Sequence, residues 1–174
     1  MMNKNSMLLA LLLLSGSLYA QGRPDSEPGF DMVKQGENPM YLSTIGVTEV
    51  PGKPDVITYP MITNVTADFP DMRSAKGSSV VVTIEMNCRT GQGRMYGMKV
   101  YSEHFGRGTL KDDFSRLQGE QDASLPDLHK QPPLTPYLLA AAMACTTVGK
   151  PLGGTPDVMR DIINRGLAAS RSRH

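Results

Sequence analysis

The stretch VVVTIEMNC, Val80 to Cys88, decides the fold of this 174-residue protein. Apolar residues stand at every second position, which is the period of a strand with one buried face. Thr83, Glu85 and Asn87 occupy the other face, and Cys88 ends the buried one. The buried face is predicted to consist of Val80, Val82, Ile84, Met86 and Cys88.

A second strand follows almost at once. Residues 90–93, TGQG, have turn chemistry, and the alternation resumes from Arg94 to Tyr101. We expect Tyr96, Met98 and Val100 on one face of this strand and Lys99 on the other. Together the two strands predict a β-hairpin.

Two β-favouring runs precede the hairpin. The first begins near Met40 and ends at the turn residues PGKP, 51–54, and the second runs from Val56 to Val65. Pro60 is expected to break the second run or to confine it to a sheet edge, because proline cannot donate to a strand ladder. The sequence leaves open whether these runs pair with each other or with the hairpin.

The region after the hairpin predicts a long loop and then two helices. Residues 102–133 are polar and contain several glycines, so we expect a loop with one helical turn around Asp112 to Leu117. Thr-Pro at 135–136 and again at 155–156 is a helix start signal, because threonine caps the free amides and proline needs no donor there. The fold class is therefore α+β, a small antiparallel β-sheet with C-terminal helices packed on one face.

The N-terminal segment is typical of a secretory signal peptide. Lys4 precedes an apolar run, Met7 to Leu14, which is followed by small residues ending at Ala20. We therefore divide the protein into a signal peptide (1–20), a disordered Pro- and Gly-rich leader (21–39), a disulfide-linked α+β domain (40–149), and a C-terminal helix with a basic tail (150–174).

Charge and length limit the functions open to the exported protein. Removal of residues 1–20 takes away one lysine and no acid, which leaves 17 basic and 17 acidic side chains. A protein without net charge has no overall attraction for nucleic acid or an anionic membrane. We expect no transmembrane segment after signal cleavage, and a location in the periplasm, at the cell surface or outside the cell.

The sequence has two cysteines, Cys88 and Cys145. An even number in an oxidising compartment predicts that they pair, which would staple a helix across the sheet. The alternative is a free thiol nucleophile with His104 or His129 as its base.

No other motif indicates catalysis or a cofactor. The three histidines have no metal-ligand spacing, so we expect no metal, no cofactor and no enzyme activity. Basic and aromatic residues on and after the hairpin are interpreted first as a solvated polar strand face, and the alternative is a surface that binds an acidic protein partner. The candidate residues of this surface are Arg89, Arg94, Tyr96, Lys99, Tyr101, Phe105 and Arg107, with His104 beside them.

These features resemble the surface-adhesin protein E family of bacterial envelope proteins. The resemblance rests on VVTIEMNCR at 81–89, the following strand with Arg94 and Tyr96, and the helix from Pro136 to Cys145, and it covers roughly residues 40 to 146. The resemblance implies a small exported α+β domain with a disulfide between the two cysteines. Some members of the family bind host proteins. No ligand-contact residue carries over from it.

The sequence thus predicts an exported bacterial envelope protein that acts as a binding, adhesion or structural module. One alternative is an accessory subunit of an envelope complex, docked through the leader and the C-terminal tail. A secreted cysteine-dependent enzyme is the other.

Overall fold

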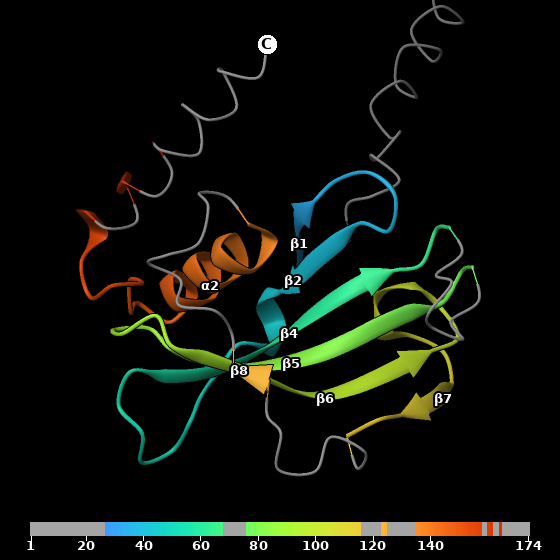
Figure 1. The fold of residues 1–174 in the computed structure, drawn as a ribbon, viewed down its shortest axis with the longest axis horizontal. Coiled ribbons are helices and arrows are strands. Elements are labelled where there is room, and N and C mark those ends of the chain that lie inside the picture. The colour runs from blue at the N-terminus through green and yellow to red at the C-terminus, as the bar shows by residue number, and fades with distance from the viewer. Residues whose placement is uncertain are drawn as a thin grey trace, which may run out of the picture.

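The molecule is built on one antiparallel β-sheet. The computed structural model describes residues 27–67, 76–115, 123–124, 135–157, 160–161 and 164. The strand order is β1-β2-β4-β5-β6-β7, with β3 paired to β4 and β8 paired to β6 (Figure 1). The strands are β1 (Phe30–Lys34), β2 (Met40–Ser43), β3 (Thr48–Glu49), β4 (Val56–Asn64), β5 (Ser79–Asn87), β6 (Gly93–Tyr101), β7 (Leu110–Asp113) and β8 (Ala123–Ser124).

The hairpin predicted from the sequence is confirmed and forms the middle of the sheet. β5 and β6 pair antiparallel, with Ile84 opposite Met95. The other edge of β5 pairs with β4 along its whole length, and β4 in turn pairs with β2. The two β-favouring runs therefore pair with each other, and the second also pairs with the hairpin.

Pro60 lies inside β4, and its missing N–H is accommodated by a gap in the neighbouring strands. β3 pairs with β4 up to Thr58 and β2 pairs from Met61 onward. Between them the backbone forms the 3-10 turn η1 (Thr44–Gly46). The expectation that Pro60 breaks this run or confines it to a sheet edge is wrong, because β4 continues through Pro60 as a central strand. The proline is tolerated because it lies where neither β2 nor β3 pairs with β4.

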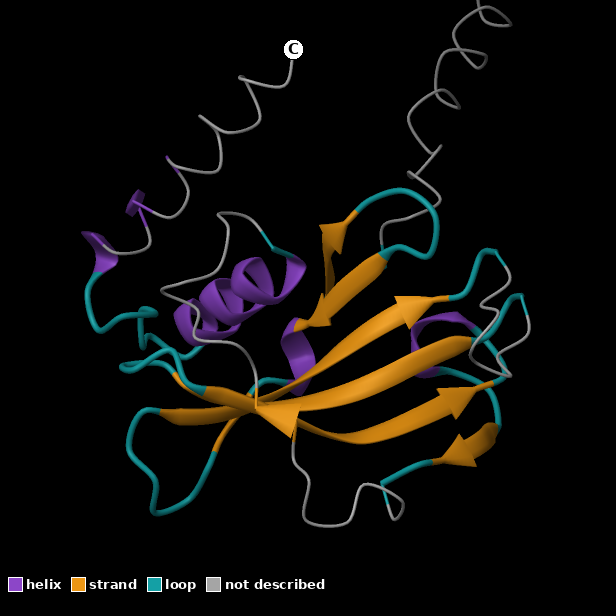
Figure 2. Cartoon of the chain, in the orientation of Figure 1, coloured by secondary structure: helices purple, strands orange, loops and turns teal. Residues whose placement is uncertain are grey.

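A helix covers one face of the sheet (Figure 2). α2 spans Pro136–Thr147, and the Thr135 hydroxyl accepts a hydrogen bond from the Leu138 N–H at 3.2 Å, as the Thr-Pro signal predicts. We call the sheet face against α2 the helix face and the other the outer face. The main core lies between α2 and the helix face and includes Leu42, Ile57, Tyr59, Met61, Ile84, Met86, Leu138, Ala141 and Leu152, all at most 3% exposed.

A smaller apolar cluster extends the core along the helix face, beyond the end of the main cluster. Its buried members are Val65, Val80 and Val100. The predicted buried face of Val80–Cys88 is confirmed, because its residues belong to these two clusters. The predicted second helix lies largely outside the described residues, among which 156–157, 160–161 and 164 are helical.

Two segments that the sequence assigns to irregular structure contain strands. The predicted leader, residues 21–39, includes β1, which pairs with β2 from Phe30 opposite Ser43. The predicted loop after the hairpin includes the 3-10 turn η2 (His104–Gly106) and β7, which stands where the sequence predicts a helical turn. The signal peptide segment, residues 1–20, lies outside the described residues.

Candidate functional site

Four of the predicted surface residues lie on the outer face of β6. The register places Arg94 opposite Glu85, Tyr96 opposite Thr83, Lys99 opposite Val81 and Tyr101 opposite Ser79. These four positions of β5 alternate with the core residues, so their partners on β6 point to the outer face as well. We call Arg94, Tyr96, Lys99 and Tyr101 the outer-face patch.

The patch exists because β6 contains a bulge. The expectation that Tyr96 shares a face with Met98 and Val100 is wrong. Between the pairs Val81–Lys99 and Thr83–Tyr96, β6 has one residue more than β5. Gly97 lies there with φ +67°, a left-handed conformation that glycine adopts without strain. The extra residue reverses the alternation and brings Tyr96 onto the same face as Lys99.

Ion pairs hold the cations of the patch in place. The Arg94 Nε and Nη2 each donate to a different oxygen of Glu85 at 3.2 Å, and its guanidinium lies 5.6 Å from the centre of the Tyr96 ring. The Lys53 Nζ lies 3.5 Å from the same carboxylate. Glu85 is only 18% exposed, whereas the Arg94 side chain is 44% exposed. The arginine is thus fixed by a shielded carboxylate and still presents much of its surface to solvent.

Lys99 sits farther along β6, near the end of β7. Its Nζ lies 3.9 Å from the Asp113 carboxylate, and its side chain is 41% exposed. Among the described residues that form these ion pairs, three are cations (Lys53, Arg94 and Lys99) and two are carboxylates (Glu85 and Asp113). A local excess of one positive charge, next to two tyrosines, suits an acidic surface.

Phe105 and Arg107 lie on and beside η2, which packs over the outer face. The Phe105 N–H donates to Asn64 Oδ1 at 2.8 Å, and the Gly106 N–H donates to Ser79 Oγ at 2.9 Å. The Phe105 ring contacts those of Phe30 and Tyr41, at centroid distances of 5.1 and 4.9 Å. Phe105 is therefore held in an aromatic cluster.

The residues on either side of Phe105 hold structural contacts too. Arg107 is ion-paired with Glu27. The His104 Nε2 lies 3.4 Å from the Val65 carbonyl oxygen. His104, Phe105 and Arg107 thus all help to fasten η2 and the start of β1 to the sheet.

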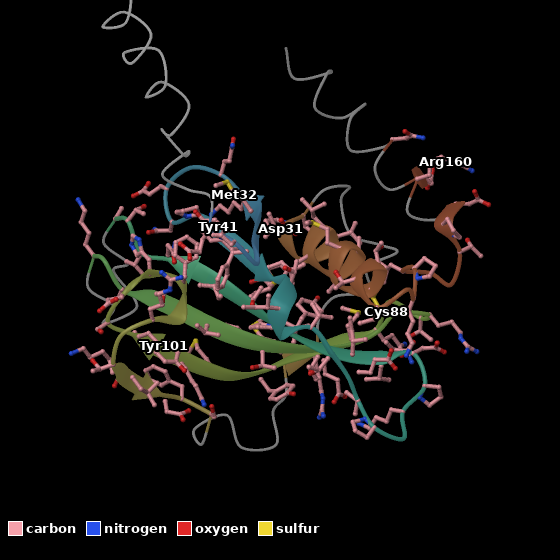
Figure 3. All side chains as sticks on the ribbon, turned by 180° about the vertical axis from the view of Figure 1, so that it is seen from behind. Asp31, Met32, Tyr41, Cys88, Tyr101 and Arg160 are labelled. Carbon is pink, nitrogen blue, oxygen red and sulfur yellow. A yellow bond between two sulfur atoms is a disulfide. The ribbon has the colours of Figure 1, made fainter. Side chains whose placement is uncertain are left out.

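Arg89 stands apart from the other candidates. It lies beyond the end of β5, next to Cys88, and is ion-paired with Asp55. Figure 3 shows Cys88 and Tyr101 at opposite ends of the sheet. The structure thus separates the seven predicted residues into the outer-face patch, the η2 pair and a distant Arg89.

The two cysteines form a disulfide, as predicted. Cys88 and Cys145 are 57 residues apart in the sequence, and their Cα atoms are 5.7 Å apart. Both are buried, and the bridge links the end of β5 to α2. Neither sulfur is a free thiol in this structure, so the arrangement offers no nucleophile for the cysteine-enzyme alternative. His129, a candidate base, lies outside the described residues.

Some residues of the site are not predicted by sequence reasoning. The pairing of Glu85 with Lys53 and Arg94 depends on strand register, which the sequence alone does not provide. Asn64, 2% exposed, holds η2 from 41 residues away. Polar contacts between residues so far apart leave no local pattern in the amino-acid sequence.

Two further properties concern the described part of the protein. None of its helices is long and apolar enough to cross a membrane. Within the same residues, no group of three His, Cys, Asp or Glu side chains is placed to hold a metal ion.

Comparison with known proteins gives a family and a fold. The model of the family described as surface-adhesin protein E matches residues 30–145, more than half of the sequence. No curated protein has a sequence that matches this one.

Solved structures of protein E from Haemophilus influenzae have the same fold. Crystal form II is 18% identical with a TM-score of 0.53, and the match covers 72% of this protein and 94% of that one. The crystal structure of protein E from non-typeable Haemophilus influenzae is 17% identical with a TM-score of 0.54, and here the match covers 87% of this protein and 93% of that one. At such identities the likeness extends to the fold alone.

Proposed function

Because this protein belongs to the surface-adhesin protein E family and is a surface adhesion and binding module, we propose that it attaches to an acidic protein partner through the outer-face patch. The observation that carries the proposal is the Gly97 bulge, which gathers Arg94, Tyr96 and Lys99 on the sheet face that α2 leaves uncovered. Arginine and tyrosine are the residue types that most often dominate binding energy at protein interfaces.

The geometry of the patch supports attachment to a partner more than a purely structural role. The Glu85 carboxylate fixes the Arg94 guanidinium before any partner arrives, so little side-chain entropy is lost on binding. Tyrosine contributes a large contact area with few rotatable bonds. The local excess of positive charge favours encounter with an acidic surface.

The remaining parts of the proposal concern location and chemistry. Residues 1–20 direct export, and the protein acts at the cell surface or in the periplasm. It acts by binding, without enzyme activity.

The test compares retention of the labelled, disulfide-bonded protein on cultured host-cell monolayers. An Arg94→Ala, Tyr96→Ala, Lys99→Ala variant is expected to bind at least about tenfold more weakly, since loss of a central arginine or tyrosine typically costs about 2 kcal/mol or more. Lys53 still contacts Glu85 in this variant, so that carboxylate keeps a cation.

The matched control removes two exposed lysines outside the patch, Lys34 and Lys76. This Lys34→Ala, Lys76→Ala variant loses as much charge as the patch variant and is expected to bind like the unaltered protein. Equal retention of the patch variant, with an unchanged melting temperature, would rule out the outer face as the binding surface. A comparable loss in the control would show that net charge, rather than the patch, governs attachment.

A further inference from the structure

A cleft lies beside the disulfide, at the opposite end of the sheet from Tyr101. It has a volume of about 420 Å³, which is within the range of small-ligand sites. Asp55, Cys88 and Arg89 line one side, and Gly149, Lys150 and Gly154 line the other. In Figure 3 the labelled Cys88 marks its position near the end of the helix.

Backbone hydrogen bonds tie both sides of this cleft to the two cysteines. The Cys88 N–H donates to the Asp55 carbonyl at 2.8 Å, and the Gly153 N–H donates to the Cys88 carbonyl at 2.7 Å. The Lys150 N–H donates to the Cys145 carbonyl at 2.9 Å. Because Leu152 is also buried in the core, the segment 149–154 cannot shift without disturbing the disulfide region. The cleft is therefore preorganised.

The charged side chains at the cleft are arranged as two ion pairs. Arg89 pairs with Asp55, and the Lys150 Nζ lies 2.8 Å from the Glu49 carboxylate. The Arg89 side chain is 70% exposed, so an incoming ligand can reach it, while Lys150 is 25% exposed. Each of the two lining cations is thus paired with a carboxylate, Arg89 with Asp55 inside the cleft and Lys150 with Glu49 beside it.

Asp55 is held in its place by an unusual backbone conformation. Its φ is +65°, in the left-handed region that aspartate and asparagine tolerate better than most residues. This conformation directs its carbonyl to Cys88 and accompanies the pairing of its side chain with Arg89. A carboxylate is thus built into the cleft against the more accessible cation.

We propose that the disulfide cleft binds a carboxylate group of a protein partner, with Arg89 and Lys150 as its ligands and with Asp55 and Glu49 as their internal competitors. Arginine recognises a carboxylate by a two-pronged hydrogen bond, and Arg89 already makes its ion pair with one. The incoming group is an acidic side chain or the C-terminus of a polypeptide, which share this chemistry. The cleft is separate from the outer-face patch, so the two proposals can fail independently.

The experiment follows the backbone amides of residues 149–154 by NMR during titration of the disulfide-bonded protein with three capped tripeptides. Acetyl-Ala-Glu-Ala-amide carries a carboxylate on its glutamate only, acetyl-Ala-Ala-Ala carries a terminal carboxylate only, and acetyl-Ala-Gln-Ala-amide carries none. A saturable shift with either acidic peptide and none with the glutamine peptide supports the proposal, and the stronger of the two identifies the source. Equal shifts with all three would overturn it.

Variants give a sharper test, because the proposal predicts that some substitutions weaken peptide binding and that another strengthens it. Arg89→Gln with Lys150→Gln should weaken binding at least about tenfold. Asp55→Asn keeps a residue that tolerates the left-handed backbone but removes the competing charge, so it should tighten binding about two- to fivefold. Lys76→Gln, at an exposed lysine outside both the cleft and the outer-face patch, should leave the titration unchanged. Weaker or unaltered binding by a folded Asp55→Asn protein would overturn the proposal even if the double variant does not fold.

Discussion

Tyr59 carries its hydroxyl into the core between the sheet and α2. The residue is fully buried, and its Oη has no hydrogen-bond partner among the described residues. An unpaired buried hydroxyl costs free energy because its bonds to water are lost on folding. The same burial raises the pKa of the Tyr59 phenol, since the phenolate would have to be formed in an apolar environment.

The substitution Tyr59→Phe should therefore leave stability unchanged or raise it by about 1 kcal/mol at neutral pH. Its effect should grow above about pH 10, where the unfolded tyrosine ionises. The folded phenol keeps its proton there, so the unaltered protein loses stability as the pH rises, and the phenylalanine variant should lose less. Urea unfolding between about pH 7 and pH 11, which brackets the ordinary tyrosine pKa, measures both effects.

Tyr137→Phe is the matched control, because Tyr137 is 37% exposed on α2. It should alter neither the stability at neutral pH nor its decline at alkaline pH. A clear destabilisation by Tyr59→Phe would mean that the buried hydroxyl has a partner after all.

At the same scale, the candidate site shows which properties of its side chains can be predicted from the sequence. Arg94, Tyr96, Lys99 and Tyr101 can all be named from the sequence as candidates, because their residue types and their strand are local properties. The face of Tyr96 is predicted wrongly, since the bulge at Gly97 depends on pairing with β5. A glycine within an alternating strand is the one local sign of such a bulge.

At the scale of elements, η1 and Pro60 form a packed junction in the sheet. A Cβ placed on Gly46 would lie 2.6 Å from Cγ and 2.8 Å from Cδ of the Pro60 ring. Glycine is therefore required at this position by close approach, which lets the backbone pass from β2 to β3 over the proline.

The substitution Gly46→Ala should destabilise the protein by about 1 to 3 kcal/mol, since the added methyl group overlaps the ring. Pro60→Ala removes the proline ring and should make room for the methyl group that Gly46→Ala adds. The double variant should accordingly lose less stability than the two single variants together, which chemical denaturation measures as a coupling energy. Additive losses would show that the junction does not depend on this contact.

The elements that the sequence predicts are those formed by local patterns. β5, β6 and α2 have regular periodicity or a cap, and they appear where expected. β1 is not predicted because its five residues FDMVK form only a short run between Gly29 and Gly36, and Phe30 packs on Phe105, which is far away in the sequence. β7 is short and none of its four residues is buried, so no buried face marks it in the sequence. Strands of this kind are defined by their partners.

At the scale of the whole molecule, the disulfide joins the two layers of the fold. Cys88 directly follows the central strand β5 and Cys145 lies on α2, so the bridge ties the helix to the sheet. The same bridge anchors the walls of the cleft through the backbone bonds of Cys88 and Cys145. Stability and the proposed carboxylate site therefore depend on one covalent link.

Replacing both cysteines by alanine should lower the stability by about 4 kcal/mol, because the bridge closes a loop with a sequence separation of 57 residues and so restricts the unfolded state. For a domain of this size, the melting temperature should fall on the order of 10 °C. Calorimetry of the variant and of the reduced protein should give similar values, whereas adding reductant to the variant should change nothing. Because the cleft is held by backbone bonds around this bridge, the variant should also lose the saturable NMR shift at temperatures where it is still folded. A variant that melts like the unaltered protein would mean that packing between α2 and the sheet alone holds the two layers together.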